Sequence, residues 1–379
     1  MVRIVDVHSH FYPKDYLTLL DRILAALTAI FLLAWWIFRL RWNNERSMSM
    51  VFMKLQIPRK ESKEDKEREK EKFSGTSDFK EPVGIMKHFF ESLHGFKEAG
   101  YYQRFRGQQF LSFEVVAQNN LIDFYVVVPE DIAKLVEKQI TTFYPDVYVE
   151  YVPDYNLFSK QAHVKGCYFR HYKHYKYPIK TFTHLNSDPL NAVTNVFSKL
   201  DVDEAAALQI MVRPRLSGWQ KKGREEAKSI LKSDHKGFLF LLNPFSWIGA
   251  LLNFFFRGPS PEYLNDQQQK PGDRTTPLTD EQVKAIEEKN TQVGFETTIR
   301  LLVSSPNPYQ ARQQYVSIRS AFAQYATTDN NALVYTKYHS NTALAVNFIY
   351  RTLKRNWTQR LLHLLNGPLL LSAEELASL

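Results

Sequence analysis

The sequence predicts an α+β protein that follows a single transmembrane helix near the N-terminus. Three observations lead to this class: an uncharged apolar run at positions 23–38, a charge-dense segment after it, and alternating strand and helix patterns from about Phe79 onward. The 379 residues are enough for an anchor and two compact units, and 44% hydrophobic residues provide for real cores. The formal charge of +9 suits an anionic partner such as nucleic acid or a membrane face.

The apolar run Ile23–Phe38 is the predicted membrane anchor. It reads ILAALTAIFLLAWWIF, which is short beside the roughly 17–25 residues of a spanning helix. Trp35 and Trp36 close the run, and Arg39 and Arg41 follow it. Aromatic residues at the headgroups and basic residues on the cytoplasmic side are typical of such an anchor. We therefore expect a single-pass protein of the inner (cytoplasmic) membrane, with the bulk of the chain cytoplasmic. A buried core helix is the alternative, which the charged sequence that follows disfavours.

Residues 1–22 carry a different signal. MVRIVDVHSHFYP is a short strand-like run that ends in His8 and His10, and this spacing places both imidazoles on one side of a strand. The run resembles the start of amidohydrolase-superfamily enzymes, which implies a pair of metal-binding histidines at the end of the first barrel strand. Two imidazoles are fewer than the three protein ligands usual at a catalytic zinc site. We expect a fused fragment and no metal cofactor, and a metal-dependent hydrolase using His8 and His10 is the alternative function.

A charged linker and a first α+β unit are expected next. Pro58–Lys72 reads PRKESKEDKEREKEK, without aromatic residues, which predicts a solvated spacer that holds a domain off the bilayer. Alternating apolar residues then predict strands at 111–115, 122–128 and 147–152, and helical spacing predicts a helix at 132–143. Asn119-Asn120 is the expected turn between the first two strands.

The second unit has the same mixture of strands and helices, although no repeat is strong enough to prove duplication. Strands are expected within 167–182 and at 208–212, 295–303 and 332–338, and helices at 190–200, 219–231 and 279–290, with another after Ser305. Strand pairs mixed with helices predict ferredoxin-like units. The expected division is 1–22 (fragment), 23–42 (transmembrane helix), 43–78 (linker), 79–160 and 161–345 (α+β units), 237–277 (apolar insertion) and 346–379 (connection).

The insertion contains Phe238–Phe256, which carries no charge. Asn243-Pro244 would break a spanning helix early, so we expect an interfacial or re-entrant hairpin in the same leaflet. A buried arm or an oligomer contact is the alternative.

Two further motifs bear on function. Gly218 and Gly223 have the glycine spacing of a P-loop, but Arg224-Glu225 follow in place of Lys-Ser/Thr, so we expect no ATP hydrolysis. Tyr168–Lys180, YFRHYKHYKYPIK, interleaves aromatic and basic residues and predicts a nucleic-acid contact, with an amphipathic edge strand as the alternative. The candidate contacts are Arg170, Tyr172, Lys173, Tyr175 and Lys176.

Over residues 23–379 the chain resembles the N-terminal region of conjugative DNA-transfer ATPases of the type IV secretion kind. The resemblance rests on KESKEDKEREKEK, FYVVVPEDIAKLVEKQITTFYPDVYVEYV, DPLNAVTNVFSKLDVDEAAALQIMVRPR, GWQKKG and GPLLLSAEELASL. It implies a non-catalytic, membrane-anchored assembly module that precedes a RecA-like ATPase motor, reached through residues 346–379. The implied partners are the membrane, the motor, further copies of the chain and DNA; no catalytic residue or cofactor is implied.

Overall fold

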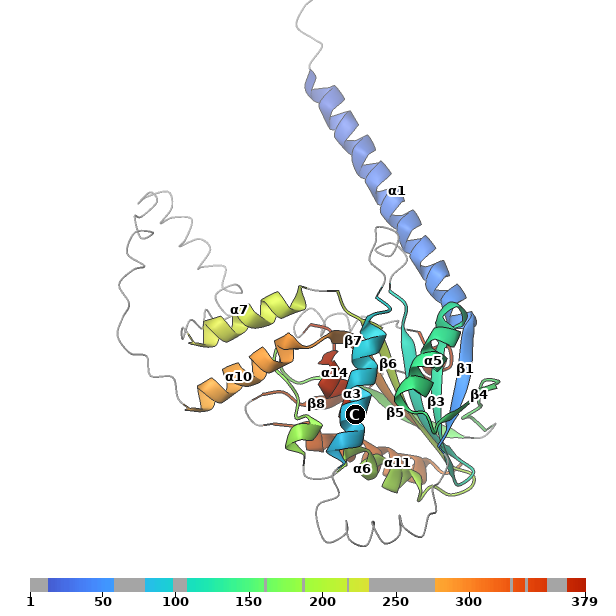
Figure 1. Cartoon of the computed structure of the whole chain (residues 1–379). Coiled ribbons are helices and arrows are strands. Elements are labelled where there is room, and N and C mark those ends of the chain that lie inside the picture. Colours follow the sequence, from blue (N-terminus) through green and yellow to red (C-terminus); the bar gives the residue numbers. More distant parts are fainter. Residues whose placement is uncertain are drawn as a thin grey trace, which may run out of the picture.

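The computed structural model describes residues 13–57, 79–97, 108–159, 162–185, 188–216, 218–231, 277–327, 330–337, 340–352 and 367–379. Within them, one antiparallel sheet and the helices packed on it form a mixed α+β body, and a long N-terminal helix leaves this body (Figure 1). The α+β class expected from the sequence is therefore confirmed.

Most of the described strands and helices agree with the periodic patterns of the sequence, but those at 50–56, 80–94, 341–349 and 370–377 were not expected. The strands are β1 (Met50–Gln56), β2 (Leu111–Gln118), β3 (Leu121–Pro129), β4 (Tyr148–Val152), β5 (His163–His171), β6 (Ala205–Pro214), β7 (Gly294–Ser305), β8 (Leu333–Lys337) and β9 (Leu370–Ser372). The helices are α1 (Pro13–Met48), α3 (Lys80–His94), α5 (Ala133–Phe143), α6 (Pro189–Phe197), α7 (Trp219–Leu231), α10 (Pro277–Thr291), α11 (Pro308–Ala321), α12 (Asn341–Ile349) and α14 (Ala373–Ala377). Asp188 and Asn307 cap α6 and α11, each followed by a proline in the first turn.

The strand order divides the sheet into two similar halves. The order is β4-β1-β3-β2-β6-β7-β5-β8, with β9 paired to β7. The first half reads 4-1-3-2 in its own chain order, and β8-β5-β7-β6 gives the same order in the second half. The halves meet where β2 pairs with β6, from Leu111↔Val212 to Gln118↔Ala205. The β2–β3 turn is Asn119-Asn120, as expected, with φ angles of 52° and 61°.

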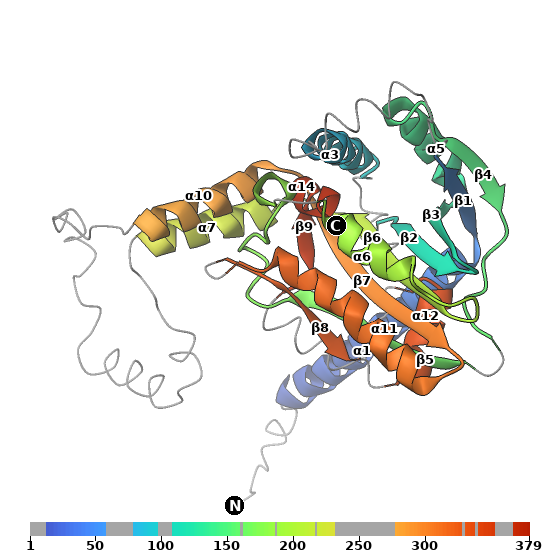
Figure 2. The same ribbon diagram turned by 90° about the horizontal axis from the view of Figure 1, so that it is seen from below.

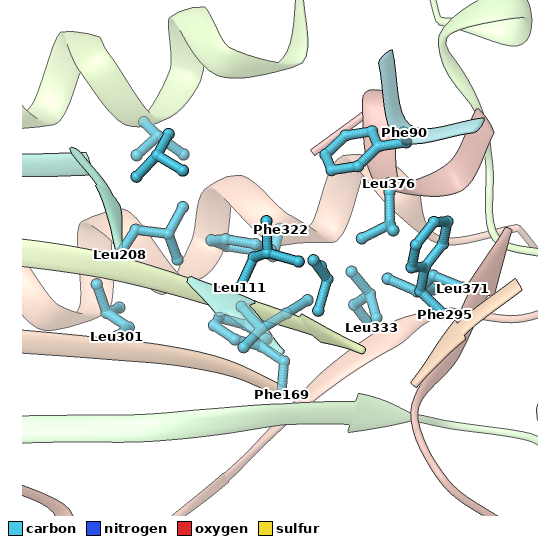
Figure 3. Packing of buried hydrophobic residues seen from close by; sticks show 14 of the residues in the cluster. Phe90, Leu111, Phe169, Leu208, Phe295, Leu301, Phe322, Leu333, Leu371 and Leu376 are labelled. Atoms are coloured by element: carbon cyan, nitrogen blue, oxygen red, sulfur yellow. The ribbon is translucent and has the colours of Figure 1, made fainter. Parts of the chain in front are cut away.

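The main core lies between the sheet and the helices on one of its faces. It joins residues of α3, α5, α6, α11 and α14 to alternate strand positions, for example Val126 and Val128 on β3. Figure 2 shows these helices on the same face of the sheet, and Figure 3 shows part of the core, including Phe90, Phe295 and Leu371. Because side chains alternate along a strand, Tyr125 and Val127 point to the opposite face.

The opposite face carries a smaller apolar cluster and a buried polar row. Glu114, Gln209 and Arg300 are register partners on β2, β6 and β7. Gln209 donates to Oε1 of Glu114 over 2.9 Å and accepts from Arg300 over 2.8 Å. Arg351, just after α12, forms two bonds of 2.9 Å to the two oxygens of Glu114. This polar row, Glu114, Gln209 and Arg300, therefore binds Arg351 and attaches the end of α12 to the centre of the sheet.

The expected linker at 43–78 needs correction at its beginning. Met50–Gln56 forms β1, which pairs with both β3 and β4 and so lies inside the first half of the sheet. The charged stretch Pro58–Lys72 follows β1 and precedes α3, so it is a connection within the α+β body. It does not separate that body from the N-terminal helix, contrary to the expected spacer.

The C-terminal segment also differs from the expected connection. β9 pairs with the start of β7, and α14 packs against α3. Leu371 and Leu376 are buried in the main core, and Ser372 with Glu375 forms a capping box at the start of α14. The last thirteen residues of 346–379 are therefore part of the folded body.

Helices α7 and α10 form an antiparallel pair, the α7–α10 arm, between β6 and β7. Ala227, Ile230, Val283 and Ile286 make its small core. Gly223 lies inside α7, where a Cβ would collide with the side chain of Asn290. The glycine spacing that resembles a P-loop therefore serves helix packing. The arm carries the apolar insertion, and Phe238–Phe256 lies outside the described residues.

Candidate functional site

Helix α1 presents apolar side chains all around its surface. Ile23, Leu24, Leu27 and Phe31 are 50–63% exposed, and other large apolar residues of the run are similarly uncovered. Within the described residues, Asp21–Phe38 is the one helical window long and apolar enough to cross a membrane, and none of it is buried. A helix that is apolar on every side has no face suited to water, so this surface requires a lipid or protein environment.

The flanks of the apolar run fit the expected headgroup region. Trp36 is 51% exposed, Trp35 is partly covered, and the exposed Arg41 lies near Glu45, with 3.8 Å between Nε and Oε1. Arg39 is on the same helix, and its side chain lies outside the described residues. The order along the helix axis is therefore apolar, aromatic and charged, as at a membrane boundary.

The junction between α1 and the sheet contains a single residue, Ser49. Its hydroxyl donates to the carbonyl of Glu45, and its own carbonyl accepts from the amide of Glu130 at the end of β3. Phe38 precedes Ser49 by eleven residues, which is about 16 Å of helix at 1.5 Å per residue. The start of β1 is thus coupled mechanically to the apolar helix, and the sheet lies close to any membrane that α1 enters.

The candidate nucleic-acid residues in Tyr168–Lys180 differ in their exposure and contacts. Tyr175 is buried with Trp219 and Leu370. Lys176 pairs with Glu226 at 2.7 Å, and Arg170 donates to Thr336 and to the carbonyl of His171. Tyr172 is 61% exposed, and Lys173 lies 5.9 Å from the ring centre of Tyr177. Arg170, Lys173, Tyr175 and Lys176 therefore have side-chain contacts within the folded body.

The metal-binding alternative depends on residues that are not described. His8 and His10 lie outside the described residues. In the parts of the chain with described positions, no group of three His, Cys, Asp or Glu side chains could hold a metal ion.

A buried charged cluster that the sequence did not predict holds the C-terminal segment. Nζ of Lys289, on α10, lies 2.9 Å from Oε2 of Glu375, on α14, and both side chains are 1% exposed. Lys289 also donates to the carbonyl of Leu370, as does His171 if its Nε2 carries the proton. Burial lowers the pKa of Lys289, and the charge of Glu375 opposes this. The cluster joins β5, β9, α10 and α14.

His171 gives this cluster a predicted pH dependence. Burial, and then the charge of Lys289, lowers the pKa of His171 to about 3. Its unfolded pKa is near 6.5, so acid favours the unfolded chain, and stability falls as the pH drops from about 6.5 towards 3. By pH 5 we expect His171 to remove about 2 kcal/mol from the free energy of unfolding. Urea unfolding at pH 7.5 and pH 5 measures this loss. The variant His171→Gln should lose clearly less between the two pH values, and an equal loss would contradict the assignment.

The fold and the exposed helix define the class: an α+β protein with one apolar N-terminal helix. The chain belongs to the family described as a domain of unknown function (DUF8128), whose model matches residues 76–379. The match begins between β1 and α3, so α1 and β1 precede it. No curated protein matches the chain.

Proposed function

We propose that this chain is a non-catalytic, membrane-anchored module of a conjugative DNA-transfer ATPase of the type IV secretion kind. It would assemble with further copies of itself and position a RecA-like motor at the cytoplasmic membrane. The observation that carries the proposal is the exposed apolar helix α1, which continues into a sheet strand through one residue. An assembly module at a membrane needs a fixed orientation at the bilayer, and such a helix would provide it.

The sheet supports the architectural part of the proposal. Each half has the order of elements strand-helix-strand-strand-helix-strand and the strand order 4-1-3-2, with antiparallel neighbours. We infer that both halves are ferredoxin-like units and that the α7–α10 arm is inserted between the second and third strands of the second unit. Two such units joined edge to edge make a broad platform, which suits a scaffold.

The C-terminal segment supports the positioning role. A motor that follows residue 379 would be attached to β9 and α14, which are paired with β7 and packed on α3. The attachment would be to folded structure, and the same sheet is joined to α1 by one residue, Ser49. Force from the motor would therefore pass through folded structure to the anchor.

Fractionation of cells tests the anchor. The full chain should remain in the membrane pellet after an alkaline carbonate wash. The variant Leu27→Arg/Phe31→Arg should move to the supernatant, since each charge at the centre of a spanning helix costs about 2.5–3.5 kcal/mol. Leu121→Arg/Leu135→Arg, at exposed positions of the body, is the matched control and should stay in the pellet. A soluble full chain, or one shortened by removal of α1 as a signal sequence, would contradict the proposal.

A further inference from the structure

A basic pocket lies at the outer edge of the second half of the sheet. It has a volume of about 580 Å³ and lies between β5, β8 and α11. Its lining includes the cations Lys165, Arg312, Arg319 and Lys337, and no carboxylate. None of these four takes part in an ion pair with a described residue. Four cations around one hollow repel each other, and an anion in the pocket would relieve this repulsion.

The aromatic residues of the basic pocket add a second observation. Arg319 stacks on the ring of Tyr335 at 3.9 Å from its centre, and its guanidinium is 5.3 Å from the ring centre of Tyr315. Tyr315 is 93% buried, and its hydroxyl lies beside Arg319 and the Cys167 thiol, with neither at ordinary hydrogen-bond geometry. A buried hydroxyl normally has a hydrogen-bond partner, so this one would gain an acceptor if a small turn of its ring brought it to a bound oxygen.

The segments that form the basic pocket contain very few acidic residues over a long stretch of the sequence. No Asp or Glu occurs between Asp154 and Asp188, and Asp329 is the only one between Glu296 and Glu374. These two stretches supply β5, α11 and β8. The acids that face α11, Asp201 and Glu204, lie on its other side, where Gln310 and Gln314 contact them. An extended cationic edge matches a polyanion better than a single small anion.

The position of the basic pocket in the sheet favours a dissolved anion over a lipid headgroup. By strand register, the start of β1 lies level with Tyr172, at the end of β5. Lys165 is seven residues back along β5, about 23 Å from this level as measured along the strand. Helix α11 begins beyond Ser305, at this same distant end of β7. The pocket therefore lies at the end of β5 and β7 opposite to the register level of the anchor, which favours an anion from the aqueous side.

We propose that the basic pocket binds the phosphate backbone of single-stranded nucleic acid, with one nucleotide entering the hollow. A duplex is too broad to enter, whereas a nucleotide unit can set its phosphate against the cations and the Tyr315 hydroxyl. Phosphate contacts from basic grooves beside aromatic rings are the usual means of sequence-independent single-strand binding. This inference adds a nucleic-acid contact to the proposed function. The two are tested separately, because the fractionation experiment does not involve the pocket.

Binding of a fluorescein-labelled 20-nucleotide oligothymidine to the full chain in detergent micelles tests the proposal by anisotropy. With about four phosphates neutralised, log K should fall with log salt with a slope near −2.8. The variant Arg312→Gln/Lys337→Gln should reduce this slope to about −1.4 and weaken binding at least tenfold at low salt. Both positions are exposed, so folding should be retained. The matched control is Lys134→Gln/Lys138→Gln on α5, which should leave both quantities unchanged.

Tyr315→Phe separates the pocket from general charge. It should weaken oligonucleotide binding about tenfold, the usual effect of losing a hydrogen bond to a charged group, while the salt slope and the charge stay the same. Its melting temperature checks that the fold is retained. Glycerol phosphate and poly-glutamate should compete poorly. Unchanged binding by Arg312→Gln/Lys337→Gln, or equal competition by glycerol phosphate or poly-glutamate, would overturn the proposal.

Discussion

Replacing Arg351 by Met should lower the free energy of unfolding by about 3–5 kcal/mol, because it leaves Glu114 as an uncompensated charge inside the sheet. Arg351 and Glu114 are 2% and 1% exposed, and two hydrogen bonds of 2.9 Å join them. Burial alone would raise the pKa of Glu114, but the charge and hydrogen bonds of Arg351 hold it below its ordinary value. Urea denaturation measures the loss.

The backbone at Arg351 strengthens this expectation. Its φ is 48°, a left-handed conformation that a non-glycine residue adopts at a cost of about 1–2 kcal/mol. Its guanidinium also reaches Asp154 at 3.1 Å and lies over the ring of Phe52 at 4.4 Å. The contacts of the Arg351 side chain with Glu114, Asp154 and Phe52 together offset the cost of this backbone conformation.

Two variants control the Arg351 experiment. Lys54→Met breaks the partly exposed ion pair between Lys54 and Asp123, 2.9 Å apart, and should cost no more than about 1 kcal/mol. The double variant Glu114→Leu/Arg351→Met removes both buried charges and should recover most of the stability lost in Arg351→Met. If Arg351→Met and Lys54→Met lowered the free energy of unfolding equally, the polar row would not be a major source of stability.

Lys289→Met should release the C-terminal segment as well as destabilise the protein by about 3 kcal/mol or more. Glu375 would lose its buried cation while still accepting from the amides of Ile179 and Ser372. We therefore expect β9 and α14 to open locally before the sheet unfolds, and amide exchange at Leu371 to accelerate more than exchange at Val127 in the centre of the sheet.

The matched control is Lys284→Met, on an exposed turn of the same helix, where the pair with Glu288 is 3.9 Å apart and largely solvated. This change should cost less than about 0.5 kcal/mol and leave exchange at Leu371 unchanged. Uniform acceleration throughout the sheet in Lys289→Met would contradict a local role for the cluster.

Local periodicity predicted most of the elements but not their partners. Helices α7 and α10 and the β2–β3 hairpin follow directly from helical spacing, alternation and Asn119-Asn120. β1 was missed because it lies between an anchor and a charged run, although Val51, Met53 and Leu55 do alternate. β9 and α14 were read as a connection, although Ser372 and Glu375 have the spacing of a capping box.

The functional features were predicted less completely, since most of them depend on contacts between distant segments. The apolar helix is evident from composition alone. Glu114 and Arg351 are 237 positions apart, and the basic pocket joins β5 to α11 and β8, so no local pattern indicates either. The interleaved stretch Tyr168–Lys180 attracted attention by its composition, yet Tyr175 and Lys176 have structural contacts. Composition identified a basic region, and the fold determined which of its cations remain exposed.

The central claim is that α1 holds the first half of the sheet against the membrane through Ser49. Ser49→Cys and Leu121→Cys, both at exposed positions, place a thiol at the junction and about 26 Å farther along the neighbouring strand. Burial raises the pKa of Cys167 to about 12, so this thiol should not react with maleimide at pH 7. In vesicles with rhodamine-labelled headgroups, a fluorophore at position 49 should be quenched far more strongly than one at 121. Equal quenching at both positions would contradict the claim.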